Sequence, residues 1–358
     1  MRGNPSRHLK DKVLDGGWTV GESIAIGRNT NGGTGGNFSI AYHITDQNGQ
    51  SAFLKALDYS RAMQQKEVAK ALQAMTAAYL FECEVLNKCR ERHLDRIVTA
   101  ITSGTITVNE AEHDGVVEYL IFELADGDLR KYLEINKKFD LAWSLRSLHQ
   151  IATGLKQLHK SGIYHQDLKP SNVLTFDGKD FKLTDLGRSV YDGHDAAHYR
   201  LAIAGDPSYA PPDLAYGSVP SDFREWRMSC DVYHLGSMVV FFMTGVGMTP
   251  LLMKHLDVSL QPRIHPFLGH WSGTYQEVLP YVLEAFDNAV TEFGSSVKDP
   301  KLRDILMRIV RELCNPNTGL RGHPKERRST GNSFSLERYI TEFNLLAHRA
   351  EIGSYNVN

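Results

Sequence analysis

Cysteine is scarce in this chain of 358 residues, and neither sign of charge dominates it. The four cysteines, Cys83, Cys89, Cys230 and Cys314, include no CxxC pair, so the sequence indicates neither a disulfide framework nor a cysteine zinc site. The 40 Lys and Arg residues nearly balance the 42 Asp and Glu residues, and no long basic block occurs. This balance argues against nucleic-acid and anionic-membrane partners, and the cysteine content fits a reducing compartment best.

Long apolar runs are also rare. The sequence has one, between Gly236 and Met253, and glycines and Pro250 interrupt it. Its length is at the lower limit for a membrane span, and a buried helix fits it better. Residues 1–17 are polar and lack the apolar stretch of a secretion signal. We therefore expect a cytoplasmic protein that begins with an N-terminal tail.

The spacing of apolar residues divides the chain into a β-rich part and a helical part. Strand-like patterns occur at 39–44, 52–57, 96–108 and 116–124. Helical spacing without proline covers 61–91, and beyond 126–128 long helices prevail, the clearest at 142–160. These patterns predict an α+β fold with a small β-rich lobe, a larger helical lobe and a favoured ligand site between them.

The predicted boundaries follow from this division. The expected parts are a tail (1–17), a first lobe (18–124), a second lobe (125–345) and a C-terminal tail (346–358). The segment at about 245–317 carries no motif that we can place. A structural helical insertion is the favoured interpretation of this segment, and a partner surface is the alternative.

One stretch carries most of the chemical information. It reads His165-Gln-Asp-Leu-Lys-Pro-Ser-Asn172, and Asp185-Leu-Gly187 begins thirteen residues after its last residue. Phosphoryl transfer needs a carboxylate that accepts a hydroxyl proton, a cation near the migrating phosphate and oxygen ligands for Mg²⁺. The stretch supplies all three in order.

This stretch resembles the protein kinase family, whose catalytic loop reads H-R-D-x-x-x-x-N and whose metal loop reads D-F-G. The resemblance covers about residues 18–340 and implies a bilobal kinase fold that uses ATP and Mg²⁺. It implies that Asp167 is the catalytic base and that Lys169 contacts the transferred phosphate. Asn172 and Asp185 would then hold the metal.

The family also has a lysine on its third strand that contacts the α- and β-phosphates and pairs with a helix glutamate. Lys55, in Ala-Phe-Leu-Lys-Ala-Leu, is similar to that lysine. Glu82 is the favoured partner because apolar residues follow it at the usual positions, and Glu84 is the alternative.

The phosphate-covering loop departs from the family pattern. Aligned with G-x-G-x-x-G-x-V, the chain has Gly33 and Gly35 at the first two glycines, Phe38 at the third and Ile40 at the valine. Glycines let backbone N–H groups approach phosphates closely. The resemblance implies that Gly33, Gly35 and Ile40 contact the nucleotide, whereas Phe38 alters the loop.

The segment 121–129 is similar to the family's hinge. By that resemblance Phe122 is the gatekeeper residue, backbone groups of Glu123 and Ala125 bind adenine, and Asp128 lies near the ribose.

Further along, Gly205-Asp-Pro-Ser-Tyr-Ala-Pro-Pro-Asp213 resembles the G-T-P-x-Y-x-A-P-E segment of serine/threonine kinases. Asp206 replaces a threonine there. The resemblance implies that Asp213 forms an ion pair with Arg327 and that Asp231 anchors the catalytic-loop backbone.

We therefore predict an ATP-dependent protein kinase that phosphorylates serine or threonine in protein substrates. A pseudokinase that binds nucleotides or partners is the main alternative, and a small-molecule phosphotransferase of similar fold is a third. Because Gln166 replaces the arginine that receives an activation-loop phosphate in many kinases, we expect activity without such phosphorylation. His194 and His198 have the i, i+4 spacing of a metal pair, but no helix is expected there.

Overall fold

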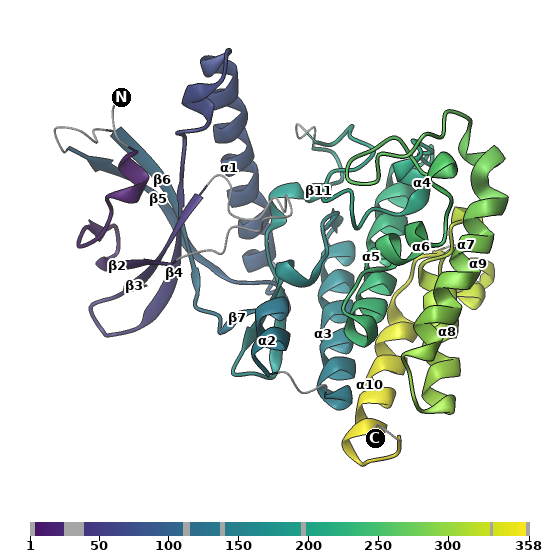
Figure 1. Ribbon diagram of the computed structural model, residues 1–358. Helices are drawn as coiled ribbons and strands as arrows, with labels where there is room; N and C mark the ends of the chain where they lie inside the picture. The colour runs from purple at the N-terminus through teal and green to yellow at the C-terminus, as the bar shows by residue number, and fades with distance from the viewer. Residues whose placement is uncertain are drawn as a thin grey trace. The chain divides into compact units, whose positions relative to one another are not determined.

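The computed structural model describes residues 4–24, 39–109, 115–136, 140–194, 198–329 and 332–355. The chain divides into two compact units, Met1–Asp126 and Gly127–Asn358, which we call the N-terminal and C-terminal units (Figure 1). The division falls two residues after the predicted boundary at 124. The N-terminal unit is built on a β-sheet and the C-terminal unit is mainly helical, which confirms the predicted α+β class.

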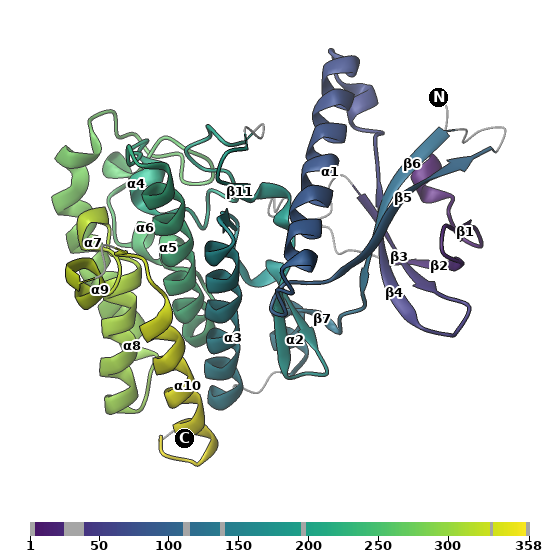
Figure 2. The ribbon, with the colours of Figure 1, turned by 180° about the vertical axis from the view of Figure 1, so that it is seen from behind.

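The N-terminal unit contains a six-stranded sheet in the order β1-β2-β3-β4-β6-β5, and each neighbouring pair is antiparallel. Its strands are β1 (Val13–Leu14), β2 (Trp18–Ile24), β3 (Ser39–Thr45), β4 (Ser51–Leu57), β5 (Ala100–Val108) and β6 (Gly115–Glu123). A short 3-10 turn (Ala62–Gln64) precedes the helix α1 (Val68–Glu91), which lies against the sheet at β5 (Figure 2). The helix predicted at 61–91 therefore begins at Val68.

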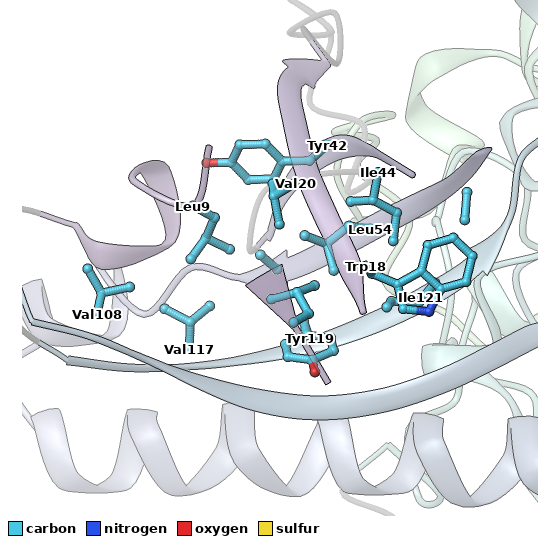
Figure 3. Packing of buried hydrophobic residues seen from close by; sticks show 13 residues of the cluster. Leu9, Trp18, Val20, Tyr42, Ile44, Leu54, Val108, Val117, Tyr119 and Ile121 are labelled. Carbon is cyan, nitrogen blue, oxygen red and sulfur yellow. The ribbon is translucent and has the colours of Figure 1, made fainter. Parts of the chain in front are cut away.

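The core of this unit lies on one face of the sheet, where alternate strand residues such as Val20, Ile44 and Leu54 are fully buried (Figure 3). Leu9 and Leu14 belong to the same core, and the Tyr42 hydroxyl donates a hydrogen bond of 2.8 Å to the Ser6 carbonyl. The prediction of an N-terminal tail is thus wrong for residues 4–17. Their polar composition obscured two leucines that cover the end of the sheet.

The C-terminal unit is a set of helices with short strands at its N-terminal end. Its helices are α2 (Leu129–Asn136), α3 (Leu141–Lys160), α4 (Pro212–Ala215), α5 (Phe223–Thr244), α6 (Met248–Lys254), α7 (Tyr275–Ser295), α8 (Pro300–Leu313), α9 (Pro324–Ser329) and α10 (Glu337–Glu351). Its strands are β7 (Gly127–Asp128), β8 (Ile163–Tyr164), β9 (Val173–Phe176), β10 (Asp180–Leu183) and β11 (Val190–Tyr191). β9 pairs with β7 and β10, and β8 pairs with β11.

Helix α5 is buried along most of its length, which confirms the buried-helix interpretation of the apolar run. Within the described residues no single helix is long and apolar enough to cross a membrane. Only α5 and α6 taken together meet that test, and they meet at a bend of 75°. The segment 245–317 forms α6, α7 and α8, which pack on α5 and on one another, and this packing favours the structural interpretation of the segment.

The predicted C-terminal tail at 346–358 is also wrong in its described part. Helix α10 continues to Glu351 and packs along α3, with Leu346 and Ala347 buried. Tyr355, beyond the helix, is buried as well. The helix has an apolar face that the polar end of the sequence obscured.

Candidate active site

The catalytic-loop segment is held by one carboxylate of the buried helix α5. Asp231 accepts hydrogen bonds from the backbone N–H groups of His165 (2.9 Å) and Gln166 (2.8 Å), and its Oδ2 lies 2.8 Å from the ring Nε2 of His159. Burial tends to raise the pKa of Asp231, but the hydrogen bond and charge of His159 outweigh it and keep that pKa below its usual value. The carboxylate is therefore ionised and fixes the start of the loop, as predicted.

Asp167 is buried, with 2% of its surface exposed, and three neighbouring groups fix the orientation of its carboxylate. Lys169 Nζ lies 3.0 Å from Oδ2, the Asn172 side-chain amide donates to Oδ2 at 3.1 Å, and the backbone N–H of Asp206 donates to Oδ1 at 2.8 Å. Burial raises the pKa of Asp167; the charge of Lys169 opposes this shift, and the charge of Asp185 adds to it. A positioned carboxylate with a raised pKa is suited to accept a proton.

Asn172 and Asp185 fit a magnesium ion by their donor atoms. Because the Asn172 amide nitrogen is turned to Asp167, its carbonyl oxygen remains as an acceptor, and Asp185 adds a half-buried carboxylate. The charge of Asp185 adds to the rise that burial causes in the pKa of Asp167, so the two carboxylates interact. Mg²⁺ prefers oxygen ligands and is commonly bound by one or two carboxylates together with water and substrate phosphates.

The described residues include no group of three or more His, Cys, Asp or Glu side chains that could hold a metal. His198, one of the two histidines with the spacing of a metal pair, is engaged by the backbone. His198 Nε2 instead lies 2.5 Å from the Ser189 carbonyl, and burial lowers the pKa of this imidazole. It is a neutral donor within the segment.

Backbone strain also marks the site. Gln166 and Asp185 both adopt left-handed conformations, with φ of 64° and 60°. Such conformations are uncommon outside glycine and cluster at functional positions. Gln166 adjoins the predicted catalytic set and Asp185 belongs to it, while Asp11, His93, Asp177 and Leu268 have positive φ elsewhere in the chain.

In the N-terminal unit, Lys55 on β4 and Glu82 on α1 form an ion pair. Lys55 Nζ lies 2.8 Å and 2.9 Å from the two carboxylate oxygens of Glu82, which is 8% exposed. The alternative partner, Glu84, lies 3.4 Å from Lys88 one turn along the same helix. The pairing with Glu82 is therefore confirmed, whereas the role of the pair toward phosphates stays a prediction.

The remaining nucleotide residues are placed unevenly. Gly33 and Gly35 lie outside the described residues, and Ile40 lies on β3. Glu123 ends β6, where its N–H donates to the Thr99 carbonyl at 3.2 Å. Ala125 follows Glu123 by two residues, just before the end of the N-terminal unit. These positions leave the adenine prediction untested.

Asp128 has a structural function that the sequence did not reveal. Its Oδ1 accepts hydrogen bonds from the N–H groups of Arg130 (3.0 Å) and Lys131 (3.2 Å) at the start of α2. The side chain therefore caps this helix, which accounts for an aspartate at this position without the ribose. The ribose contact stays a prediction.

The Asp206 carboxylate stabilises a local turn at Ser208 and forms a long ion pair with Lys169. Its Oδ1 accepts from the N–H (3.0 Å) and hydroxyl (2.6 Å) of Ser208, and Lys169 Nζ lies 3.5 Å from its Oδ2. Burial opposes ionisation, but the hydrogen bonds of Ser208 and the charge of Lys169 lower the pKa of Asp206 below its usual value. A permanent negative charge therefore shares Lys169 with Asp167.

We expect the Asp206→Thr variant to keep or increase phosphotransfer to serine and threonine peptides. A threonine hydroxyl can accept from the Ser208 N–H and preserve the turn, while it removes the competing charge on Lys169. The measurement is kcat/KM with peptides at fixed MgATP. A loss greater than about tenfold, equivalent to about 1.4 kcal/mol, in a folded variant would reveal a positive role for this carboxylate.

The ion pair of Asp213 corrects the sequence prediction. Asp213 Oδ1 lies 2.6 Å from Nη2 of Arg321, and both residues are fully buried. Arg321 also donates to the Ser229 hydroxyl (2.8 Å) and to the Asn315 carbonyl (3.0 Å). Arg327, the predicted partner, donates to the Gly319 carbonyl instead. Arg321 occupies this position because the chain turns back toward α5 immediately after α8.

Sequence reasoning missed a second buried arginine, Arg227 on α5. Its guanidinium bonds to Gln166 and to carbonyls of the segment after His198. No local pattern distinguishes it from Arg224 one turn earlier, which is exposed. Only the three-dimensional position of Gln166 reveals its importance.

The comparisons with known proteins agree with this geometry. Residues 32–264 match the model of the protein kinase domain, which covers more than half of the chain. The fold and the site define a kinase-like protein, and the chain belongs to the protein kinase family.

Individual relatives are kinases of several groups. The chain is 28% identical to an Aurora kinase of Schizosaccharomyces pombe over 199 residues, which are 55% of this chain and 46% of the relative. It is 30% identical to Aurora kinase B of Drosophila melanogaster over 169 residues, 46% of this chain and 45% of the relative. It is also 30% identical to mitogen-activated protein kinase 5 of Arabidopsis thaliana over 159 residues, 44% of this chain and 40% of the relative. In each case the matched part spans less than half of the relative.

Proposed function

We propose that this protein is an ATP-dependent kinase that transfers the γ-phosphate of MgATP to serine or threonine hydroxyls of protein substrates. The observation that carries the proposal is the Asp167 carboxylate, oriented by Lys169, Asn172 and the Asp206 N–H within one unit. The kinase names of its relatives support the same activity.

In this mechanism Asp167 orients the acceptor hydroxyl and takes its proton as the oxygen attacks. Lys169, already beside Asp167, stabilises charge on the transferred phosphate. Lys55, held by Glu82, is assigned to the α- and β-phosphates. Asn172 and Asp185 would hold Mg²⁺, which when bound neutralises negative charge on the phosphate oxygens.

The direct test is to incubate the purified protein with labelled ATP, Mg²⁺ and generic protein substrates, and to locate the labelled residues by mass spectrometry. Label on serine or threonine supports the proposal. A protein that binds MgATP but labels neither itself nor any substrate is a pseudokinase. Label on a small molecule alone would favour the third alternative.

We expect Asp185→Ala to remove phosphotransfer and to weaken the dependence of nucleotide binding on Mg²⁺. The substitution deletes the only carboxylate assigned to the metal, and half-buried Asp185 makes no ion pair within the described residues. The measurement is ATP affinity with and without Mg²⁺, together with the transfer rate. Asp180→Ala on β10, with unchanged transfer, is the control. Full activity of the Asp185 variant would contradict the metal assignment.

We also expect phosphatase-treated enzyme to be fully competent. The side chains of Ser189 and Tyr191 are buried, and the ring of half-buried Tyr199 stacks on Phe223 at 4.4 Å. Gln166, where an arginine would receive a phosphate, is engaged with Arg227 and Asp231. The measurement compares the activity of phosphatase-treated enzyme with that of Ser189, Tyr191 and Tyr199 variants at fixed MgATP. Activation by phosphorylation of more than about tenfold would contradict this expectation.

The cytoplasm is the proposed location. The four cysteines are all free thiols, and three of them are buried, which suits a reducing compartment. Fractionation of the cells that produce the protein would test the location.

A further inference from the structure

Arg227 on α5 is fully buried, with 0% of its surface exposed, and no acidic side chain pairs with it among the described residues. Arginine is rarely buried without a carboxylate partner, because removing its charge from water is costly. Burial lowers the pKa of Arg227 to about 10, and the guanidinium is still charged at neutral pH. The charge of Asp231 opposes this shift without a direct ion pair, and neutral groups supply the hydrogen bonds that replace water.

Those partners come from two loops that lie far apart in sequence. Nη1 donates to the side-chain oxygen of Gln166 at 3.1 Å and to the Leu201 carbonyl at 3.3 Å, and Nη2 donates to the Tyr199 carbonyl. The guanidinium also lies 3.4 Å from the ring centre of Trp226 on its own helix. One buried cation thus joins the catalytic loop to the segment 198–201.

Neighbouring contacts hold the same segment. The Tyr199 ring stacks on Phe223 with 15° between the ring planes, and His198 Nε2 lies 2.5 Å from the Ser189 carbonyl. Gln166 in turn donates to the Arg227 carbonyl at 2.9 Å and to Asp231 at 3.1 Å. The segment is therefore fixed on the side of α5 as well as on the side of the metal loop.

We propose that Arg227 is a positioning residue that holds segment 198–201 in its ordered conformation and couples it, through Gln166, to the loop that carries Asp167. The arginine binds backbone carbonyls, so it orders the segment without any added phosphate. In phosphorylation-dependent kinases a phosphate paired with arginines supplies this order. The inference rests on the proposed function and explains how the enzyme would be competent in its unmodified form.

The test compares Arg227→Met with Arg224→Met. Methionine preserves much of the length and apolar stem of arginine but donates no hydrogen bond. Arg224 lies one turn earlier on α5, is 65% exposed at its side chain and contacts Tyr164 and Asp192. Two properties are measured: hydrogen exchange of the amides in residues 198–205, and kcat/KM for a protein substrate together with the affinity for MgATP.

In Arg227→Met we expect exchange in residues 198–205 to rise at least tenfold and kcat/KM to fall at least tenfold, with MgATP affinity changed less than twofold. Arg224→Met should change neither exchange nor kcat/KM by more than twofold. A folded Arg227→Met protein with unchanged exchange in 198–205 overturns the inference. So does an equal increase in exchange across α3, because that result describes general destabilisation.

If Arg227→Met does not fold, the Arg227→Lys variant tests whether Arg227 orders segment 198–201. Lysine keeps the charge but lacks the planar group that reaches several acceptors at once, so we expect an intermediate rise in exchange confined to 198–205. Wild-type exchange in Arg227→Lys overturns the inference. Because hydrogen exchange is measured without phosphotransfer, failure of the ordering by Arg227 can be distinguished from failure of the proposed function. An inactive wild type would refute only the latter.

Discussion

The Asp167→Asn variant is expected to lose phosphotransfer by a factor of about 10²–10⁴, the usual contribution of a positioned general base. Asparagine keeps the shape of the side chain but cannot take the proton of the acceptor hydroxyl. MgATP affinity should change little, because Asp167 is assigned to the acceptor rather than to the nucleotide. Single-turnover transfer and nucleotide titration measure the two effects separately.

The pH dependence of the transfer rate in the wild-type enzyme is a second test of the role of Asp167. Transfer requires ionised Asp167, whose pKa is raised by burial, so the rate should fall as the pH is lowered, beginning above the usual range of an aspartate. This acidic limb should be absent from the residual activity of Asp167→Asn. Undiminished transfer in the variant would remove Asp167 from the mechanism.

The largest effect on stability is expected for Arg321→Ala, at about 3–5 kcal/mol of unfolding free energy. The variant leaves Asp213 buried without its partner, and it also leaves the Ser229 hydroxyl and the Asn315 carbonyl without a donor. Burial already raises the pKa of Asp213, and loss of the guanidinium removes the main opposing influence. Urea unfolding monitored by tryptophan fluorescence measures the change, since Trp143, Trp226 and Trp271 report on the C-terminal unit.

Arg327→Ala is the matched comparison, because the sequence favoured Arg327 as the partner of Asp213. Its one hydrogen bond among the described residues, to the Gly319 carbonyl, is solvent-exposed, so the loss should stay below about 1 kcal/mol. Equal losses in the two variants would show that the Asp213 pair does not dominate the stability of this region.

The contrast between these arginines shows where sequence reasoning reaches its limit. The stretch from His165 to Asn172 could be interpreted directly because its functional groups are adjacent in sequence and their spacing is nearly fixed. Glu82 could be favoured over Glu84 because the apolar residues Val85 and Leu86 follow it at the positions usual in the kinase family. Arg321 could not be selected, since it lies in the connection between α8 and α9, and only its contacts with Ser229 and Asn315 identify it as the partner.

The same limit explains the errors at the ends of the chain. Leu9 and the pair Val13-Leu14 are the few apolar residues of a polar stretch, so no periodicity indicates that Leu9 and Leu14 complete the core of the sheet. Arg227 likewise has no local signal. Its importance depends on Gln166 and Tyr199, which are 61 and 28 residues away in sequence. Interactions of this kind are set by the fold and not by local pattern.

The engagement of the first residues with the sheet has a practical consequence for truncation and domain exchange. The region that matches the kinase family begins at residue 32, beyond Leu9, Leu14 and Trp18, and it ends at residue 264, before α7, α8 and α10. A fragment cut to the match would expose the apolar surfaces that these parts cover, and such surfaces favour aggregation. A chimera with another kinase should therefore keep the buried residues of both ends, from Leu9 to Tyr355, in one block.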